Sequence, residues 1–100
     1  MSGFVLTRKA LDDLKEIGSY TERNWGRTHR NRYLLMLDQC FHDLASSPLK
    51  GRDCGFIRSG YRKYQVGKHL VFYRALALDQ IEIVRVLHEC MDVEQHLDDG

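Results

Sequence analysis

Two stretches in the first half of the chain carry apolar residues at the spacing of an amphipathic helix. The inward positions of the first stretch, which starts at Arg8, are Leu11, Leu14, Ile17, Gly18 and Thr21. Those of the second stretch, which starts near Thr28, are Tyr33, Leu37, Cys40, Phe41 and Leu44. Steps of three and four residues put side chains on one face of a helix. The first half of the chain is therefore predicted to hold two helices, each with one buried face.

The ends of these helices are marked by residues that favour caps and breaks. Thr7, at the end of the β-prone run 4–7, is a good N-cap for the first helix, and Gly26 is a stop signal after it. Pro48 disfavours helical backbone at the residue before it and so ends the second helix. The short connection between the two helices, at Gly26, predicts a helical hairpin. We expect Trp25, at the corner, to anchor that corner in the core or, alternatively, to contact a partner.

The second half of the chain changes to the period of β-strands. After a polar loop over residues 49–55, four β-prone runs cover residues 56–58, 61–66, 69–75 and 81–87. The turn residues between them are Ser59-Gly60, Gly67-Lys68 and residues 78–80. These runs predict an antiparallel meander of three or four strands. The number depends on whether Ser59-Gly60 is a turn or a bulge inside one strand.

The last of these runs has apolar residues on both faces. A regular strand would place Ile81, Ile83, Arg85 and Leu87 on one face, and Glu82, Val84, Val86 and His88 on the other. A strand that is apolar on both faces is covered on both, as strands inside a sheet are. We therefore expect this strand to lie inside the sheet and not at its edge.

Together these elements predict an α+β fold. An N-terminal strand and an α-helical hairpin come first, followed by a three- to four-stranded antiparallel meander, with the hairpin packed on one face of the sheet. A chain of 100 residues, of which 43% are apolar, can bury one core but not two. We expect a single domain over residues 1–100, in which residues 89–100 form a short helix or a flexible tail.

Composition excludes several classes of protein. No apolar run approaches the roughly 20 residues of a membrane span, and the N-terminus lacks the pattern of a secretory signal, so we expect a cytoplasmic protein without membrane contact. Cys40, Cys54 and Cys90 are widely spaced, which favours free thiols, with Cys40 in the core. The histidines lack metal-ligand spacing. We expect no metal and no cofactor.

The charge of the chain is unevenly distributed. The formal net charge is only +1, but residues 23–32 carry four arginines and no acid, and residues 58–74 carry five basic residues and no acid. The tail, residues 89–100, carries acidic residues instead. This distribution predicts a basic face, and scattered solvated cations are the alternative.

Four strings, in this order and at these spacings, resemble the ParE branch of the RelE/ParE toxin superfamily over nearly the whole chain. They are residues 10–17, Ile57-Arg58 with Gly60–Tyr64, Gly67–Arg74 and Val84–Asp92. The resemblance implies a RelE/ParE-like fold and the toxic role in a type II toxin–antitoxin pair. It also implies that the toxin traps the cleaved-DNA complex of DNA gyrase, without chemistry of its own. The implied partners are gyrase and a cognate ParD-like antitoxin in a higher-order complex.

The resemblance and the residue types together suggest two sets of binding residues. Arginines and aromatics dominate binding hot spots, so the expected target-binding residues are Arg58, Tyr61, Arg62, Lys63, His69, Arg85 and His88. The expected antitoxin-binding residues are Leu14, Trp25, Tyr33 and Leu37. We expect no sequence-specific nucleic-acid binding by the toxin alone.

Two alternatives stay open. A RelE-type, ribosome-dependent mRNA endonuclease would use His69 or His88 as acid or base, with Arg62, Lys63 and Arg85 as phosphate cations. Histidine at position 69, where such nucleases carry an arginine, and the lack of a tyrosine in residues 89–96 count against it, so no catalytic residue is expected. The simpler expectation is that His88 bonds to a neighbouring loop and that His69 is an exposed residue at a strand start. The second alternative is a non-toxic, divergent module that still binds an antitoxin.

Overall fold

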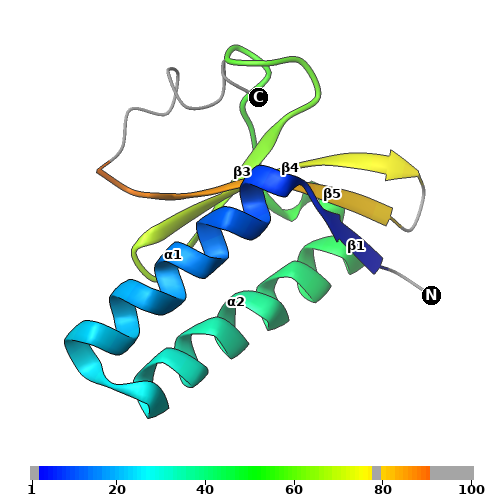
Figure 1. The fold of residues 1–100 in the computed structure, drawn as a ribbon. Coiled ribbons are helices and arrows are strands. Elements are labelled where there is room, and N and C mark those ends of the chain that lie inside the picture. The colour runs from blue at the N-terminus through cyan, green and yellow to red at the C-terminus, as the bar shows by residue number, and fades with distance from the viewer. Residues whose placement is uncertain (1–2, 78–79, 91–100) are drawn as a thin grey trace.

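A mixed β-sheet and a helical hairpin make up the computed structural model, which describes residues 3–77 and 80–90 (Figure 1). The elements, in chain order, are β1 (Gly3–Leu6), α1 (Arg8–Trp25), α2 (Arg27–Ser46), the 3-10 turn η1 (Pro48–Lys50), β2 (Arg52–Asp53), β3 (Arg62–Val66), β4 (His69–Ala77) and β5 (Gln80–His88). The sheet order is β1-β5-β4-β3-β2. β1 is parallel to β5, and the other pairs are antiparallel. The predicted fold class is therefore confirmed.

The helical hairpin begins and turns at the residues that the sequence indicated. The Thr7 hydroxyl accepts a hydrogen bond from the Ala10 amide at 3.0 Å and donates one to the Val84 carbonyl at 2.7 Å, so one side chain caps α1 and ties it to β5. Gly26 ends α1 with φ of 91°, a backbone conformation that favours glycine, and α2 starts at the next residue. The predicted hairpin is confirmed (Figure 1).

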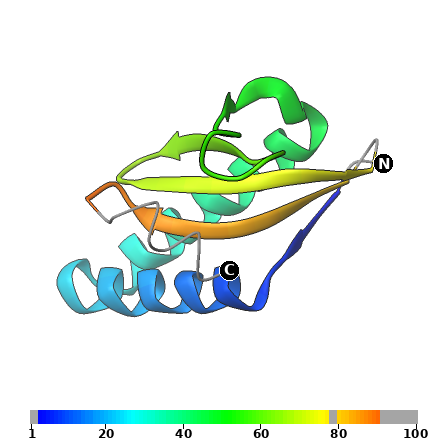
Figure 2. The same cartoon turned by 90° about the horizontal axis from the view of Figure 1, so that it is seen from above.

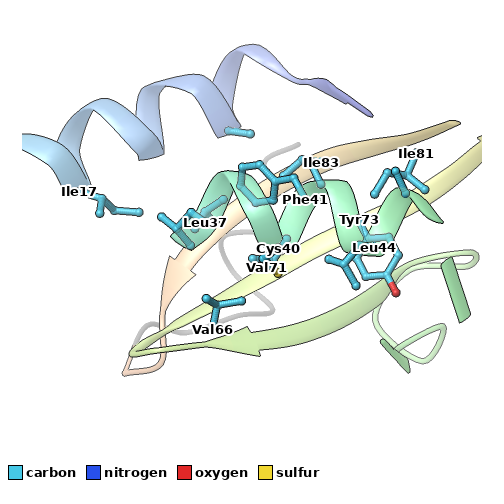
Figure 3. Packing of buried hydrophobic residues seen from close by; sticks show 13 residues of the cluster. Ile17, Leu37, Cys40, Phe41, Leu44, Val66, Val71, Tyr73, Ile81 and Ile83 are labelled. Atoms are coloured by element: carbon cyan, nitrogen blue, oxygen red, sulfur yellow. The ribbon is translucent and has the colours of Figure 1, made fainter. Parts of the chain in front are cut away.

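The hairpin buries its apolar stripe against one face of the sheet. Figure 3 shows α2 side chains packed against residues of the strands. The buried members labelled there include Leu37, Cys40, Phe41, Leu44, Val71, Tyr73 and Ile83. α1 lies along the β5 side of the sheet (Figure 2). The predicted stripe of α2 is therefore the centre of the main core, although Tyr33 is only partly buried.

A second, smaller core lies on the other apolar surface of the sheet. Cys54, Tyr61, Phe72, Val84 and Leu87 are buried there, with Ile57 and Leu70 packed against them. The segment between β2 and β3 supplies three of these residues. β5 thus lies between β1 and β4 and contributes to both cores, which confirms its predicted place inside the sheet.

The predicted faces of β5 are wrong in one respect. Phe72 pairs with Arg85 but Tyr73 pairs with Ile83, so Val84 is an extra residue on β5 and the strand is bulged there. A bulge reverses the alternation beyond it. Val86 therefore joins Ile81 and Ile83 in the main core, and Leu87 joins Val84 in the second.

The run 56–58 is not a strand, contrary to one form of the meander prediction. Ile57 N donates to Cys54 O at 2.9 Å, Tyr61 N donates to Arg58 O at 3.1 Å, and Cys54 N donates to Tyr61 O at 2.9 Å. These bonds close residues 54–61 into a compact loop whose turn includes Gly60, with φ of 86°. Ser59-Gly60 is therefore part of a turn, and the short strand β2 precedes it inside the segment predicted to be a loop.

Trp25 does not anchor the corner of the hairpin in the core. Its side chain is 60% exposed and stacks on His29, with ring centroids 5.7 Å apart. The corner projects beyond the sheet (Figure 1), so no core lies beneath it. The prediction that Trp25 is buried is wrong, and its role as a partner contact stays a prediction.

The main core yields a stability prediction. Phe41 is 2% exposed, and we expect Phe41→Ala to lower the free energy of unfolding by about 3–5 kcal/mol, because it removes a buried ring and leaves a cavity. Leu35→Ala, on the same helix but 60% exposed, is the control and should change it by no more than about 0.5 kcal/mol. Urea unfolding measures both. Equal losses would contradict the orientation of α2.

Candidate functional site

The residues predicted to bind the target do not form one patch. Arg58, Tyr61 and Arg85 line a hollow at one end of the sheet. The rings of His69 and His88 meet elsewhere, 5.4 Å apart between centroids. Arg62 belongs to neither group, because its guanidinium donates to Gly51 O at 2.8 Å and so holds β3 to the segment after η1. Lys63, beside it, pairs through its backbone with Arg52 of β2.

The first group is part of what we call the basic hollow. Its charged lining residues are Arg8, Lys9, Arg58, Arg74 and Arg85 against one acid, Glu82. They come from the start of α1, the 54–61 loop, β4 and β5. Tyr61 was predicted to bind the target, but only 8% of it is exposed, and it belongs to the second core. Sequence reasoning missed Arg8 and Lys9, and it counted Arg74 toward a basic face but not as a binding residue, because only the folded chain brings them together.

Two cations of the basic hollow are held by carboxylates. Arg74 Nε donates to Glu82 Oε1 at 2.8 Å, and this bond raises the pKa of Arg74 above its ordinary value. Arg85 donates to the Asp13 carboxylate from Nε at 2.8 Å and from Nη2 at 3.0 Å, and the Val86 amide donates to it at 2.9 Å. The Arg85 and Asp13 side chains are only 13% and 12% exposed. Arg85 therefore fixes α1 to β5 at the bulge.

The two histidines form a small cluster with Tyr33. The Tyr33 hydroxyl lies 2.6 Å from His69 Nδ1 and accepts a hydrogen bond from the Lys68 amide at 3.2 Å. His88 Nδ1 accepts from the Cys90 amide at 3.2 Å, which confirms that His88 bonds to the adjacent loop. The prediction that His69 is exposed is wrong, since it is partly buried under these neighbours.

The environment of this cluster shifts two pKa values. Burial, followed by the charge of His88, lowers the pKa of His69 below the ordinary value of 6.5. Burial raises the pKa of Tyr33. The neutral imidazole is thus favoured near pH 7. In the part of the chain described, no group of three His, Cys, Asp or Glu residues could hold a metal ion.

Two apolar grooves flank the helices. The hairpin groove lies between α1 and α2, with Leu14, Gly18, Leu34 and Leu37 in its lining and charged residues at its rim. Leu14 and Leu37 are therefore brought together as predicted for one surface, although Leu37 has no exposed area of its own. Tyr33 and Trp25 lie outside this lining.

The edge groove lies between α2 and β3. Leu35, Met36 and Gln39 line it from the helix, with residues 64–66 on the strand side. β2 pairs only with Arg62 and Lys63, so among the described residues no strand pairs with the outer side of residues 64–66. Leu35 is 60% exposed and Met36 is 39% exposed. The groove therefore offers an unpaired strand edge beside exposed apolar side chains.

The Asp13–Arg85 contact predicts a structural role that can be measured. Asp13→Ala should lower the free energy of unfolding by about 2–4 kcal/mol, because it removes the carboxylate that accepts from a largely buried guanidinium and from the Val86 amide. Asp12→Ala, at an exposed position on the same helix, is the matched control and should cost less than about 0.5 kcal/mol. Urea unfolding of both decides. If the two were equally stable, Arg85 would not hold α1 to β5.

His69 predicts a pH dependence of stability. Because its pKa is lowered in the folded chain, the unfolded chain takes up this proton at a higher pH, so acid favours unfolding. Stability should fall as the pH drops from 6.5 through the folded pKa, and His69→Gln should reduce that fall. His29→Gln, at the exposed hairpin corner, should leave the fall unchanged. A His69 ring that titrates above 6.5 by NMR would contradict the assignment.

Comparison with known proteins identifies the family to which the chain is similar. The family model described as "ParE toxin of type II toxin-antitoxin system, parDE" matches residues 4–93. The chain is 40% identical over 96 residues to Toxin ParE1 of Mycobacterium tuberculosis (strain ATCC 25618 / H37Rv), covering 96% of this chain and 98% of that one. It is 36% identical over 97 residues to Toxin ParE1 of Caulobacter vibrioides, covering 97% and 99%.

A solved structure shares the fold. The chain superimposes with a TM-score of 0.72 on a structure described as the chromosomal ParDE TA system from P. aeruginosa, at 19% identity, covering 88% of this chain and 96% of that one. None of the described helices is long and apolar enough to cross a membrane. The match over residues 4–93 and the two near-full-length relatives show that the chain belongs to the family of ParE toxins of type II toxin–antitoxin systems.

Proposed function

We propose that this chain is a toxin that traps the cleaved-DNA complex of DNA gyrase, and that a cognate ParD-like antitoxin neutralises it. The family match over residues 4–93 carries the proposal. The toxin acts in the cytoplasm, as one domain over residues 1–100, and binds without turning over a substrate. Its effect is to hold gyrase in the state in which the DNA is cut.

The antitoxin has two grooves to occupy. The hairpin groove suits the apolar face of an amphipathic helix, since Leu14 and Leu34 lie in its lining and charges lie at its rim. The edge groove suits an extended segment that adds a strand beside residues 64–66 and places side chains against Leu35 and Met36. An antitoxin that passes from one groove to the other would wrap α2, and antitoxin dimers would give a higher-order complex.

Binding rather than catalysis fits the side chains that the fold brings together. The cations that a ribonuclease would need are engaged in structural contacts: Arg62 bonds to Gly51 O and Arg85 bonds to Asp13. The expected target surface is instead the exposed part of the basic hollow around Arg58, whereas Trp25, exposed at the hairpin corner, stays a predicted antitoxin contact.

One observation favours a second candidate function. The lowered pKa of His69 favours its uncharged imidazole, which lies beside the Tyr33 hydroxyl and the ring of His88. This arrangement could move a proton near pH 7. A ribosome-dependent mRNA endonuclease of the RelE type is therefore the alternative. It would show as cleavage of mRNA on ribosomes, which His69→Gln abolishes.

An assay with purified gyrase tests the proposed function. Toxin, plasmid DNA, gyrase and ATP are combined, and linear DNA is scored after detergent and protease treatment. We expect linear DNA to rise with toxin and to be suppressed by the antitoxin. No linear DNA with folded toxin at micromolar concentration, together with mRNA cleavage on ribosomes, would replace this proposal with the second candidate.

A further inference from the structure

The basic hollow concentrates positive charge far beyond what the whole chain carries. Five basic residues and one acid line it, whereas the formal net charge of the chain is +1. Its positive potential therefore reflects a local arrangement and not the overall charge. Local cation clusters of this kind attract anionic ligands even when the protein as a whole is nearly neutral.

Two of these cations, Arg8 and Arg58, line the hollow without being engaged by the described part of the protein. Arg8 projects from the first turn of α1 and Arg58 from the 54–61 loop, and both are exposed. Within residues 3–77 and 80–90, neither guanidinium has a side-chain hydrogen bond or an ion pair. They come from different elements but line the same hollow, so neighbouring phosphates of one ligand can engage both.

The other lining residues of the hollow also favour an anionic ligand. α1 has no acidic residue in its first turn to offset the positive end of its dipole, and its N-cap Thr7 lines the hollow. On the strand side, Arg74 and Arg85 are oriented by one carboxylate each, which fixes their side chains at the hollow. The hollow therefore combines cations that are held by carboxylates with two, Arg8 and Arg58, that can adapt to a ligand.

The chemistry of the lining favours phosphate over an acidic peptide. Four of the five cations are arginines, whose planar fork of donors fits two phosphate oxygens at once. The large apolar side chains that are exposed in the described part of the chain, among them Trp25, Leu35 and Phe56, all lie outside the hollow. An acidic peptide would find charge there but no apolar anchor of the kind on which peptide binding relies.

We propose that the basic hollow binds phosphates of a DNA backbone, independently of base sequence. The inference deepens the proposed function and rests on it for the source of the DNA, which would be the segment that gyrase has cut. The toxin would then contact both components of the trapped complex, protein and DNA. Arg8 and Arg58 supply the phosphate contacts, while Arg74 and Arg85, each paired with a carboxylate, form the adjoining part of the lining.

The test measures DNA binding without gyrase. A fluorescent duplex of about 20 base pairs is titrated with the purified full chain between about 50 and 200 mM salt, by anisotropy. Each phosphate contact adds about 0.9 to the slope of log affinity against log salt, so the paired change Arg8→Gln with Arg58→Gln should lower that slope by about 2. We also expect at least tenfold weaker binding at about 50 mM salt.

The matched control removes the same charge elsewhere. Arg27→Gln with Arg32→Gln changes two exposed arginines of α2 that do not line the hollow. This pair should keep the slope and the affinity, and thermal unfolding should be unchanged in both variants. If the control lost as much DNA affinity as the hollow variant, binding would be spread over the surface and the proposal would be wrong.

Two further arms separate the remaining outcomes. A labelled polyglutamate peptide is titrated in parallel, and binding of peptide but not DNA through Arg8 and Arg58 would overturn the choice of ligand. Wild-type toxin and the hollow variant are also run in the gyrase assay. If DNA binding depends on the hollow but gyrase is not poisoned, the phosphate site stands and the proposed function fails. If gyrase is poisoned equally by the hollow variant, the phosphate site plays no part in trapping.

Discussion

β5 has to satisfy two cores at once, and much of the molecule is arranged around that constraint. It lies between β1 and β4, it buries Ile81, Ile83 and Val86 under the helices, and it buries Val84 and Leu87 under the 54–61 loop. The bulge at Val84 makes this possible, because it changes which face the following residues occupy.

The start of α1 is fixed to the same place. The Thr7 hydroxyl bonds to the Val84 carbonyl, the Thr7 amide bonds to the Ile83 carbonyl at 3.1 Å, and Asp13 accepts hydrogen bonds from Arg85 and the Val86 amide. The helix, the bulge and the basic hollow are thus parts of one local structure. A change at the bulge would move the cations of the hollow together with the helix.

The helical half of this fold could be predicted from sequence because its signals are local. The stripe ending at Leu44, the cap at Thr7 and the stop at Gly26 each depend on residues within a few positions of one another. The bulge at Val84 could not be predicted, because it follows from the competing demands of two cores that the chain assembles only in space. Trp25 was misplaced for a similar reason: an aromatic at a corner is buried only when something lies beneath it.

The candidate site, like the fold, could be predicted from the sequence only in part. The basic stretch 58–74 predicted a basic face, and its Arg58 and Arg74 do meet in one hollow. However, Arg8 and Arg85 complete it from distant parts of the chain, while Arg62 and Tyr61 serve the fold. Residue type alone does not separate an arginine that binds a ligand from one that holds two elements together. The contacts that each guanidinium makes in the folded chain do separate them.

We propose that this ParE-family chain acts by occupying its target and not by turnover. A titration of toxin against a fixed amount of gyrase, with linear DNA followed over time, distinguishes the two modes of action. At substoichiometric toxin, we expect the linear DNA to reach a plateau whose height scales with the ratio of toxin to gyrase. Linear or degraded product that keeps accumulating with time at a small fraction of the gyrase concentration would mean that the toxin acts catalytically, and would contradict it.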